Sequence, residues 1–186
     1  MNETAGRGEG SDIIGIARTI ATRAHADQTD KSGAPYIQHP TAVVSLLAHA
    51  PGFAELTHDK QEVAIAMAWL HDVLEDTPLT SNDLRKQGLP PDVIEGVIAL
   101  THMPQEPRLT YYARLKENPL ARLVKIADMA HNASPERLLL LEPDTRTRLI
   151  NKYSLGAAIL TNSSHESLWF SDITGVVPYV DVRETR

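Results

Sequence analysis

Residues 71–76 read His71-Asp72-Val73-Leu74-Glu75-Asp76 and place one histidine and three carboxylates within six positions. They directly follow the apolar run Ala-Met-Ala-Trp-Leu at 66–70. On a helix, the spacing i, i+3, i+4 puts the three carboxylates on one face, where they repel one another and resist burial. A bound cation or basic ligand would compensate for this charge. The alternative is an acidic helix end that is simply solvated.

The sequence contains a second His-Asp pair, His58-Asp59, so the dipeptide alone does not indicate a site that binds a cation or ligand. Glu62 follows Asp59 by three positions, which is the pattern of an N-cap with a capping box at the start of a helix. We therefore interpret this second pair as structural. The pair at 71–72 differs because two further acidic residues follow it.

Two other segments supply side chains of the same chemistry. His39 stands in Pro35-Tyr36-Ile37-Gln38-His39-Pro40, where the turn and Pro40 fix it at the start of a helix. Asp128 interrupts an apolar stretch of a predicted helix and lies four residues before Asn132, on the same face. Together with His71 and Asp72, these residues offer two imidazoles and two carboxylates. That set indicates a hard nitrogen and oxygen site for a divalent metal.

Apolar periodicity and breakers predict an all-α fold, a helical bundle in a single domain. The predicted helices cover about 11–27, 40–50, 59–75, 80–87, 91–101, 108–116, 119–132 and 143–160. We expect no strand before the C-terminal tail. Residues 1–10 are expected to be a disordered leader, 11–160 the domain, and 161–186 a C-terminal extension. The extension either folds over the helical core, covers a ligand or makes a dimer contact.

Composition excludes several classes of protein. The chain has 186 residues, a formal net charge of −6 and no cysteine. The negative charge argues against a general nucleic-acid or anionic-membrane binder, although a small anionic ligand is compatible with it if a metal is bound. Disulfides and thiolate chemistry are excluded. The first ten residues do not resemble a secretory signal, and no run is long enough to span a membrane, so we expect a cytoplasmic protein.

In these segments the chain resembles the HD superfamily of metal-dependent phosphohydrolases. More narrowly, it resembles the hydrolase domain of the RelA/SpoT alarmone enzymes and their stand-alone relatives, the small alarmone hydrolases. The likeness rests on Ser-Gly-Ala-Pro-Tyr-Ile-Gln-His-Pro at 32–40, Leu-His-Asp-Val-Leu-Glu-Asp-Thr at 70–77 and Val-Lys-Ile-Ala-Asp-Met-Ala-His-Asn at 124–132. It begins at about Ala24-His25.

The resemblance implies an HD fold that binds one Mn²⁺ through His39, His71, Asp72 and Asp128. It implies that Glu75 and Asp76 orient and deprotonate the attacking water, and that Asn132 contacts the nucleotide. The implied reaction removes the 3′-pyrophosphate of guanosine tetraphosphate or pentaphosphate (ppGpp or pppGpp), giving GDP or GTP and pyrophosphate. We expect no synthetase domain.

The motif segments hold further candidates for binding a nucleotide. Lys31 and Lys125 are the nearest basic residues and could hold the pyrophosphate, although Lys125 could equally be a solvated lysine of an amphipathic helix. Ser32 and Tyr36 belong to the same motif and are further substrate-binding candidates. His25 and His131 are expected to lie behind the metal ligands and orient them.

One departure from the family concerns the base. Family members usually carry an arginine immediately before the lysine that matches Lys31, and the resemblance implies that it stacks on guanine. Here the position is Asp30, and a carboxylate neither stacks in this way nor attracts phosphate. Met129 also stands where the family tends to have arginine. An alternative substrate is therefore another phosphorylated nucleotide, such as the 2′-phosphate of NADPH. A nucleotide-binding regulator without turnover is a third interpretation.

Overall fold

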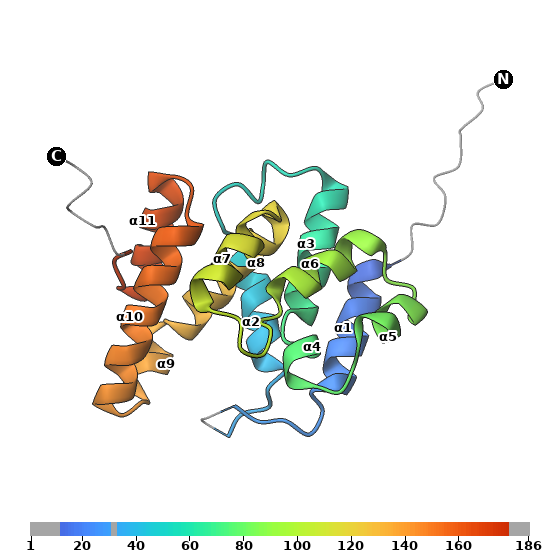
Figure 1. The fold of residues 1–186 in the computed structure, drawn as a ribbon, viewed down its shortest axis with the longest axis horizontal. Helices are drawn as coiled ribbons and strands as arrows, with labels where there is room; N and C mark the ends of the chain where they lie inside the picture. Colours follow the sequence, from blue (N-terminus) through green and yellow to red (C-terminus); the bar gives the residue numbers. More distant parts are fainter. Residues whose placement is uncertain (1–11, 31–32, 179–186) are drawn as a thin grey trace.

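The computed structural model describes residues 12–30 and 33–178, and these residues form an all-α protein (Figure 1). Within these ranges the chain forms no strand, and one isolated β-bridge joins Thr29 to Pro35. The predicted all-α fold is confirmed. The helices are α1 (Ile13–Ala24), α2 (Gln38–Leu47), α3 (His58–Leu70), α4 (Val73–Asp76), α5 (Ser81–Lys86), α6 (Pro91–Leu100), α7 (Arg108–Lys116), α8 (Pro119–Asn132), α9 (Pro135–Leu139), α10 (Pro143–Leu160) and α11 (Ser164–Thr174).

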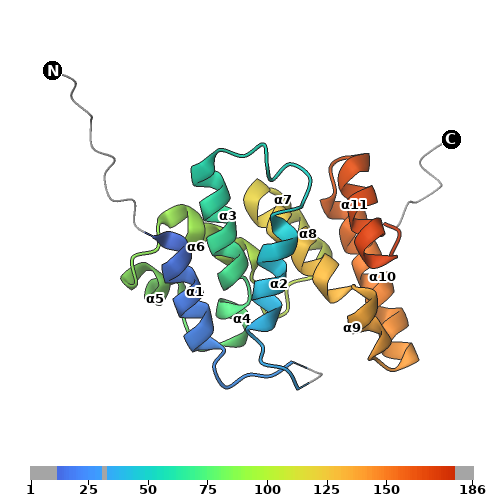
Figure 2. The same ribbon diagram turned by 180° about the vertical axis from the view of Figure 1, so that it is seen from behind.

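Helix α8 lies in the middle of the molecule and is its most buried element. It lies between the group formed by α1 to α6 and the pair α10 and α11, as Figures 1 and 2 both show. It packs against α2, α3, α6, α7, α10 and α11. Its apolar residues, such as Val124 and Ala127, are fully buried. Asp128 is buried in this helix, so its charge requires partners.

The predicted helix over 59–75 is broken where the sequence changes from apolar to acidic. Helix α3 ends at Leu70, His71 and Asp72 form a turn, and α4 begins at Val73. Asp72 is the N-cap of α4, and its carbonyl accepts hydrogen bonds from the backbone N–H groups of Glu75 and Asp76. The expectation of three carboxylates stacked on one continuous helix is therefore wrong. Asp72 and Asp76 both contact the hydroxyl of Tyr36, whereas Glu75 accepts a hydrogen bond from the backbone of His102.

The start of α3 also differs from the prediction. The helix begins at His58 after the N-cap Thr57, and Asp59 lies in the first turn rather than at the cap. An acidic residue there is favourable because the first turn exposes unpaired backbone N–H groups. His58 and Glu62 are 3.8 Å apart on the surface. This second His-Asp pair thus belongs to a helix end, but without the capping box.

The described part of the extension packs onto the helical core. Ser163 caps α11, which packs against α8 and α10. Phe170 is fully buried in the main core, and Val176 is buried with it. Residues 161–178 therefore match the first of the three interpretations. The leader and residues 179–186 lie outside the described ranges, and no described helix is both long and apolar enough to cross a membrane.

Candidate metal centre

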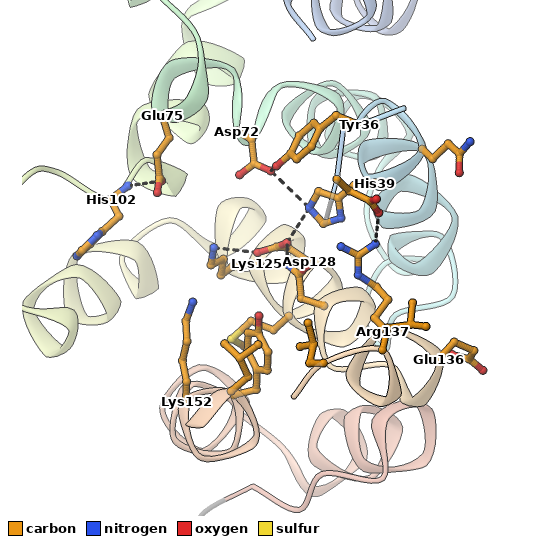
Figure 3. Close-up of a pocket in the computed structure, with 18 of the residues that line it drawn as sticks. Tyr36, His39, Asp72, Glu75, His102, Lys125, Asp128, Glu136, Arg137 and Lys152 are labelled. Carbon is orange, nitrogen blue, oxygen red and sulfur yellow. Dashed lines mark hydrogen bonds and ion pairs between the residues drawn. The ribbon is translucent and has the colours of Figure 1, made fainter. Parts of the chain in front are cut away.

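Four predicted ligands from three parts of the chain lie close together, and Figure 3 shows three of them, His39, Asp72 and Asp128. His39 lies in the first turn of α2, His71 and Asp72 form the turn after α3, and Asp128 lies in α8. The Nε2 atom of His39 lies 3.1 Å from Nε2 of His71, 3.4 Å from Oδ2 of Asp72 and 3.1 Å from Oδ1 of Asp128. His71 Nε2 lies 2.9 Å from the same Asp72 oxygen and 3.6 Å from the Asp128 oxygen.

These separations fit a shared divalent cation. Ligand atoms that bind an octahedral cation at about 2.1 Å lie roughly 3 Å from their neighbours. The donors are two imidazole nitrogens and two carboxylate oxygens, a set that suits Mn²⁺ among other divalent metals. Within the described ranges, the donor atoms of His39, His71 and Asp72 all lie within 4.8 Å of one another. Asp128 is not part of this group of three, but its Oδ1 lies next to both histidines.

The surroundings hold both histidines in orientations that suit ligands. The Nδ1–H of His71 donates to the carbonyl of Ala68 at 2.8 Å, which leaves Nε2 directed at the carboxylates. On His39, Nδ1 faces Nδ1 of His131 at 2.7 Å. Burial and the neighbouring His39 lower the pKa of His131 to about 4, so His131 is neutral near pH 7. His131 therefore lies directly behind a candidate ligand, as the sequence suggested.

Asp128 is held by hydrogen bonds on both carboxylate oxygens. Lys125 Nζ lies 2.8 Å from Oδ2, and the amide of Asn132 donates to Oδ1 at 2.7 Å. Burial alone would raise the pKa of Asp128, but Lys125 and the two histidines hold it well below the usual value. The carboxylate is thus ionised, as a metal ligand must be. Lys125 is largely buried and ion-paired rather than solvated.

Tyr36 links two of the acidic residues. Its hydroxyl donates to Oδ2 of Asp72 at 2.6 Å and is 3.2 Å from Oδ2 of Asp76. Burial and Asp72 raise the pKa of Tyr36, so the phenol keeps its proton and acts as a donor. The ring of His25 lies 4.8 Å from the ring of Tyr36, and its Nδ1 contacts Gln28. His25 is therefore placed behind Tyr36 and not at the metal ligands.

Glu75 and Asp76 have different positions. Glu75 lines a cavity of about 660 Å³, and its Oε2 accepts a hydrogen bond of 3.0 Å from the backbone N–H of His102. The loop that carries His102 is braced by Arg114, which binds both carboxylate oxygens of Glu106. Asp76 is not among the described residues that line the cavity. Burial and Asp72 raise its pKa.

The cavity opens beside the ligands and contains residues that sequence reasoning missed. Its walls include Arg108 from α7, Lys152 from α10 and Arg137 from α9. Helix α9 itself was not predicted, although Ser134-Pro135-Glu136 carries an N-cap, a proline at the first helical position and an acidic first turn. For Arg108 and Lys152 the sequence holds no signal, because each is one of several cations on an amphipathic helix.

Asp30 is not an isolated negative charge at the cavity. Its Oδ2 lies 3.2 Å from Arg137 Nη1, and its Oδ1 accepts a hydrogen bond from the backbone N–H of Ala34. The arginine therefore offsets the repulsion of phosphate that the sequence alone suggests. Tyr36, Lys125 and Asn132 also line the cavity. The other two predicted substrate contacts, Lys31 and Ser32, lie outside the described residues.

The fold and the site define an all-α protein with a buried two-histidine, two-carboxylate centre at the wall of a cavity. The HD domain family matches residues 17–151, and the chain belongs to that family.

Similar curated proteins carry related names. The chain is 34% identical over 140 residues to a guanosine-3′,5′-bis(diphosphate) 3′-pyrophosphohydrolase of Haemophilus influenzae, covering 70% of this chain and 19% of the relative. It is 33% identical to the bifunctional (p)ppGpp synthase/hydrolase SpoT of Escherichia coli K12, covering 72% of this chain and 19% of that protein. The chain thus spans about a fifth of the length of these relatives.

The chain also matches two proteins that are shorter than these relatives, and the match covers a larger share of their length. Human guanosine-3′,5′-bis(diphosphate) 3′-pyrophosphohydrolase MESH1 is 31% identical over 122 residues, which are 62% of this chain and 65% of MESH1. A solved structure described as a metazoan ortholog of SpoT that hydrolyzes ppGpp superposes with a TM-score of 0.69 at 22% identity. The match covers 90% of this chain and 96% of that one. This likeness supports the fold.

Proposed function

We propose that this chain is a Mn²⁺-dependent hydrolase that removes the 3′-pyrophosphate of ppGpp or pppGpp and releases GDP or GTP. The observation that carries the proposal is the convergence of His39, His71, Asp72 and Asp128 beside a cavity of about 660 Å³ that contains cationic side chains. A cavity of this size accommodates a nucleotide. The names of the relatives support the choice of substrate.

The roles of the side chains follow from their positions. His39, His71, Asp72 and Asp128 would hold the cation, which when bound activates water and neutralises negative charge on the phosphates. Glu75, fixed by the N–H of His102, accepts the proton of the attacking water. Water oxygen bonds to the phosphorus next to the ribose, and the bond from that phosphorus to the 3′-oxygen breaks. The 3′-oxygen takes up a proton from solvent, which gives the 3′-hydroxyl of GDP or GTP and free pyrophosphate. Tyr36 keeps Asp72 in place through its hydroxyl.

The proposal is tested with metal-stripped protein, incubated with and without Mn²⁺. Guanosine tetraphosphate and NADPH are supplied in parallel, and the release of pyrophosphate and phosphate is followed. We expect Mn²⁺-dependent pyrophosphate and GDP from guanosine tetraphosphate. Phosphate from NADPH alone would contradict the proposal and favour the second substrate, for which Asp30 in place of the family arginine is the motivation. Binding of Mn²⁺ without either reaction would contradict both.

The Asp30–Arg137 pair gives a prediction about substrate affinity. Arg137→Ala removes a guanidinium that lines the cavity beside Asp30, so we expect the KM for guanosine tetraphosphate to rise roughly tenfold, the loss of one charge-assisted contact. Asp30→Ala should not raise the KM, because it removes only the negative partner. The double variant should lie between the two single variants. An unchanged KM in Arg137→Ala would show that this pair does not face the substrate.

A further inference from the structure

Helices α7 and α10 form one wall of the cavity. This wall carries cationic side chains to which the proposed function assigns no role. Arg108 is the first residue of α7, and Lys152 lies in the second half of α10. Both line the cavity, and Lys152 points into it from α10 (Figure 3). None of the four candidate metal ligands comes from these helices. The cavity therefore has a metal-binding wall and a separate basic wall.

The two basic residues lack acidic partners. Throughout 12–30 and 33–178, neither Arg108 nor Lys152 forms an ion pair with a carboxylate, whereas Lys125 is paired with Asp128. Lys152 is half-buried, and its Nζ lies 5.3 Å from the ring centre of Tyr153. The pKa of Lys152 is lowered by burial and by the neighbouring cations Arg108 and Lys125. The carboxylates of Asp128 and Glu75 act in the opposite direction. A partly desolvated cation beside other cations is unfavourable until an anion binds.

The cavity also has an apolar lining, which suits the base and ribose of a nucleotide. Met129, Leu149 and Tyr153 contribute apolar surface to the same cavity. An apolar lining with charged groups at separate places favours a ligand whose apolar part lies between two anionic ends. A nucleotide with phosphates on both the 3′ and the 5′ position of its ribose has this form.

We propose that Arg108 and Lys152 form a second anion subsite, which binds the 5′-diphosphate of the nucleotide while its 3′-pyrophosphate lies at the metal centre. The assignment rests on the proposed function for the identity of the nucleotide. It makes these residues determinants of specificity: they discriminate between nucleotides with and without 5′-phosphates. They take no part in the bond that breaks.

The kinetic test compares guanosine tetraphosphate with guanosine 3′-diphosphate, which has a free 5′-hydroxyl. Lys152→Met keeps most of the side-chain volume and removes the charge. We expect it to raise the KM for guanosine tetraphosphate roughly tenfold, and to leave kcat and the KM for the 5′-hydroxyl substrate nearly unchanged. Lys152→Arg should retain the preference. Equal effects of Lys152→Met on the two substrates would overturn the subsite.

Arg148→Met is the matched control, because Arg148 is exposed on the same helix and does not line the cavity. It removes the same charge from the same element. We expect its KM values to equal those of the unmodified protein. A control that reproduced the effect of Lys152→Met would show that net charge alone, rather than a subsite, controls affinity, and would overturn the proposal.

A binding experiment separates this proposal from the proposed function. Calorimetry with metal-free protein measures the affinity for GDP and for guanosine, and no turnover is needed. We expect GDP to bind at least tenfold more tightly than guanosine, and this preference to be lost when Arg108 and Lys152 are both replaced by methionine. Equal binding of GDP and guanosine by the unmodified protein would overturn the subsite even if guanosine tetraphosphate is hydrolysed. A preference for GDP without turnover would support the subsite and leave only the reaction in error.

Discussion

Asp72→Asn is expected to abolish Mn²⁺ binding and to lower the turnover of guanosine tetraphosphate by about 10³-fold or more, because the cation contributes several kcal/mol to the transition state. The asparagine keeps the size of the side chain and still accepts the hydrogen bond of Tyr36. It lacks the negative charge that compensates the cation. His71→Ala should have the same effect, since it removes an imidazole whose Nε2 lies 2.9 Å from the same carboxylate. Metal content after dialysis and initial rates measure both.

Glu75→Gln is the matched variant for this experiment, because it neutralises a neighbouring carboxylate outside the ligand set. It should retain the metal and lose turnover, as expected of the group that accepts the proton. Its hydrogen bond from His102 can persist through the amide oxygen. Loss of metal in Glu75→Gln would make Glu75 a ligand. Retention of Mn²⁺ together with substantial turnover in Asp72→Asn would show that the ligand assignment is wrong.

The helices were predictable because their apolar residues recur at helical spacing between strong breakers. The prediction failed where contacts between distant parts of the chain determine the structure. No glycine or proline separates His71-Asp72 from the preceding helix, yet α3 ends at Leu70. The turn brings Asp72 to Tyr36 and His39, which are more than thirty positions away, and tertiary contacts of this kind override helix propensity. Helix α9 is short, and short helices depend on tertiary packing more than on propensity.

The candidate metal ligands could be named from sequence because a cluster of imidazoles and carboxylates in apolar surroundings is costly without a cation. The residues that contact these ligands could not be predicted from the sequence. The contact between His39 and His131 joins residues 92 positions apart, and that between Arg137 and Asp30 joins residues 107 apart. No spacing rule relates such positions. The basic residues of α7 and α10 became candidates only when the fold placed them at one cavity.

A buried ion pair holds the C-terminal extension to the helix that carries Asp128. Arg122 of α8 binds Glu166 of α11 through two hydrogen bonds of 2.8 and 2.9 Å, and it also donates to the carbonyl of Leu160. Glu166 accepts a further hydrogen bond from the backbone N–H of Asn162. Both side chains are about nine-tenths buried. Each charge is therefore compensated only as long as the other is present.

Arg122→Ala is expected to lower the free energy of unfolding by about 3–5 kcal/mol, because it leaves the Glu166 carboxylate buried without its partner. For a domain of this size the melting temperature should fall by roughly 6–20 °C. Replacing Arg122 and Glu166 together by methionine should cost much less, since no unpaired charge remains. Calorimetric melting of the three proteins measures these differences. Lys86→Ala, which breaks the exposed pair of Lys86 with Asp83, is the control and should change little.

The effect of Arg122→Ala should depend on pH in a defined direction. Burial raises the pKa of Glu166, but the bonds to Arg122 outweigh this and lower it below the usual value. A carboxyl group with a lowered pKa in the folded state stabilises the protein above its unfolded pKa, about 4.3, and loses this contribution as the pH falls through the folded pKa. Arg122→Ala removes the largest of the contributions that lower the pKa of Glu166, so Glu166 protonates at a higher pH. The difference in stability between the two proteins should therefore be full at pH 7 and narrow as the pH falls, first through the pKa of Glu166 in the variant and then through its lower pKa in the unmodified protein. A difference that stayed constant down to pH 3 would show that lost packing of the arginine, rather than its charge, destabilises the variant.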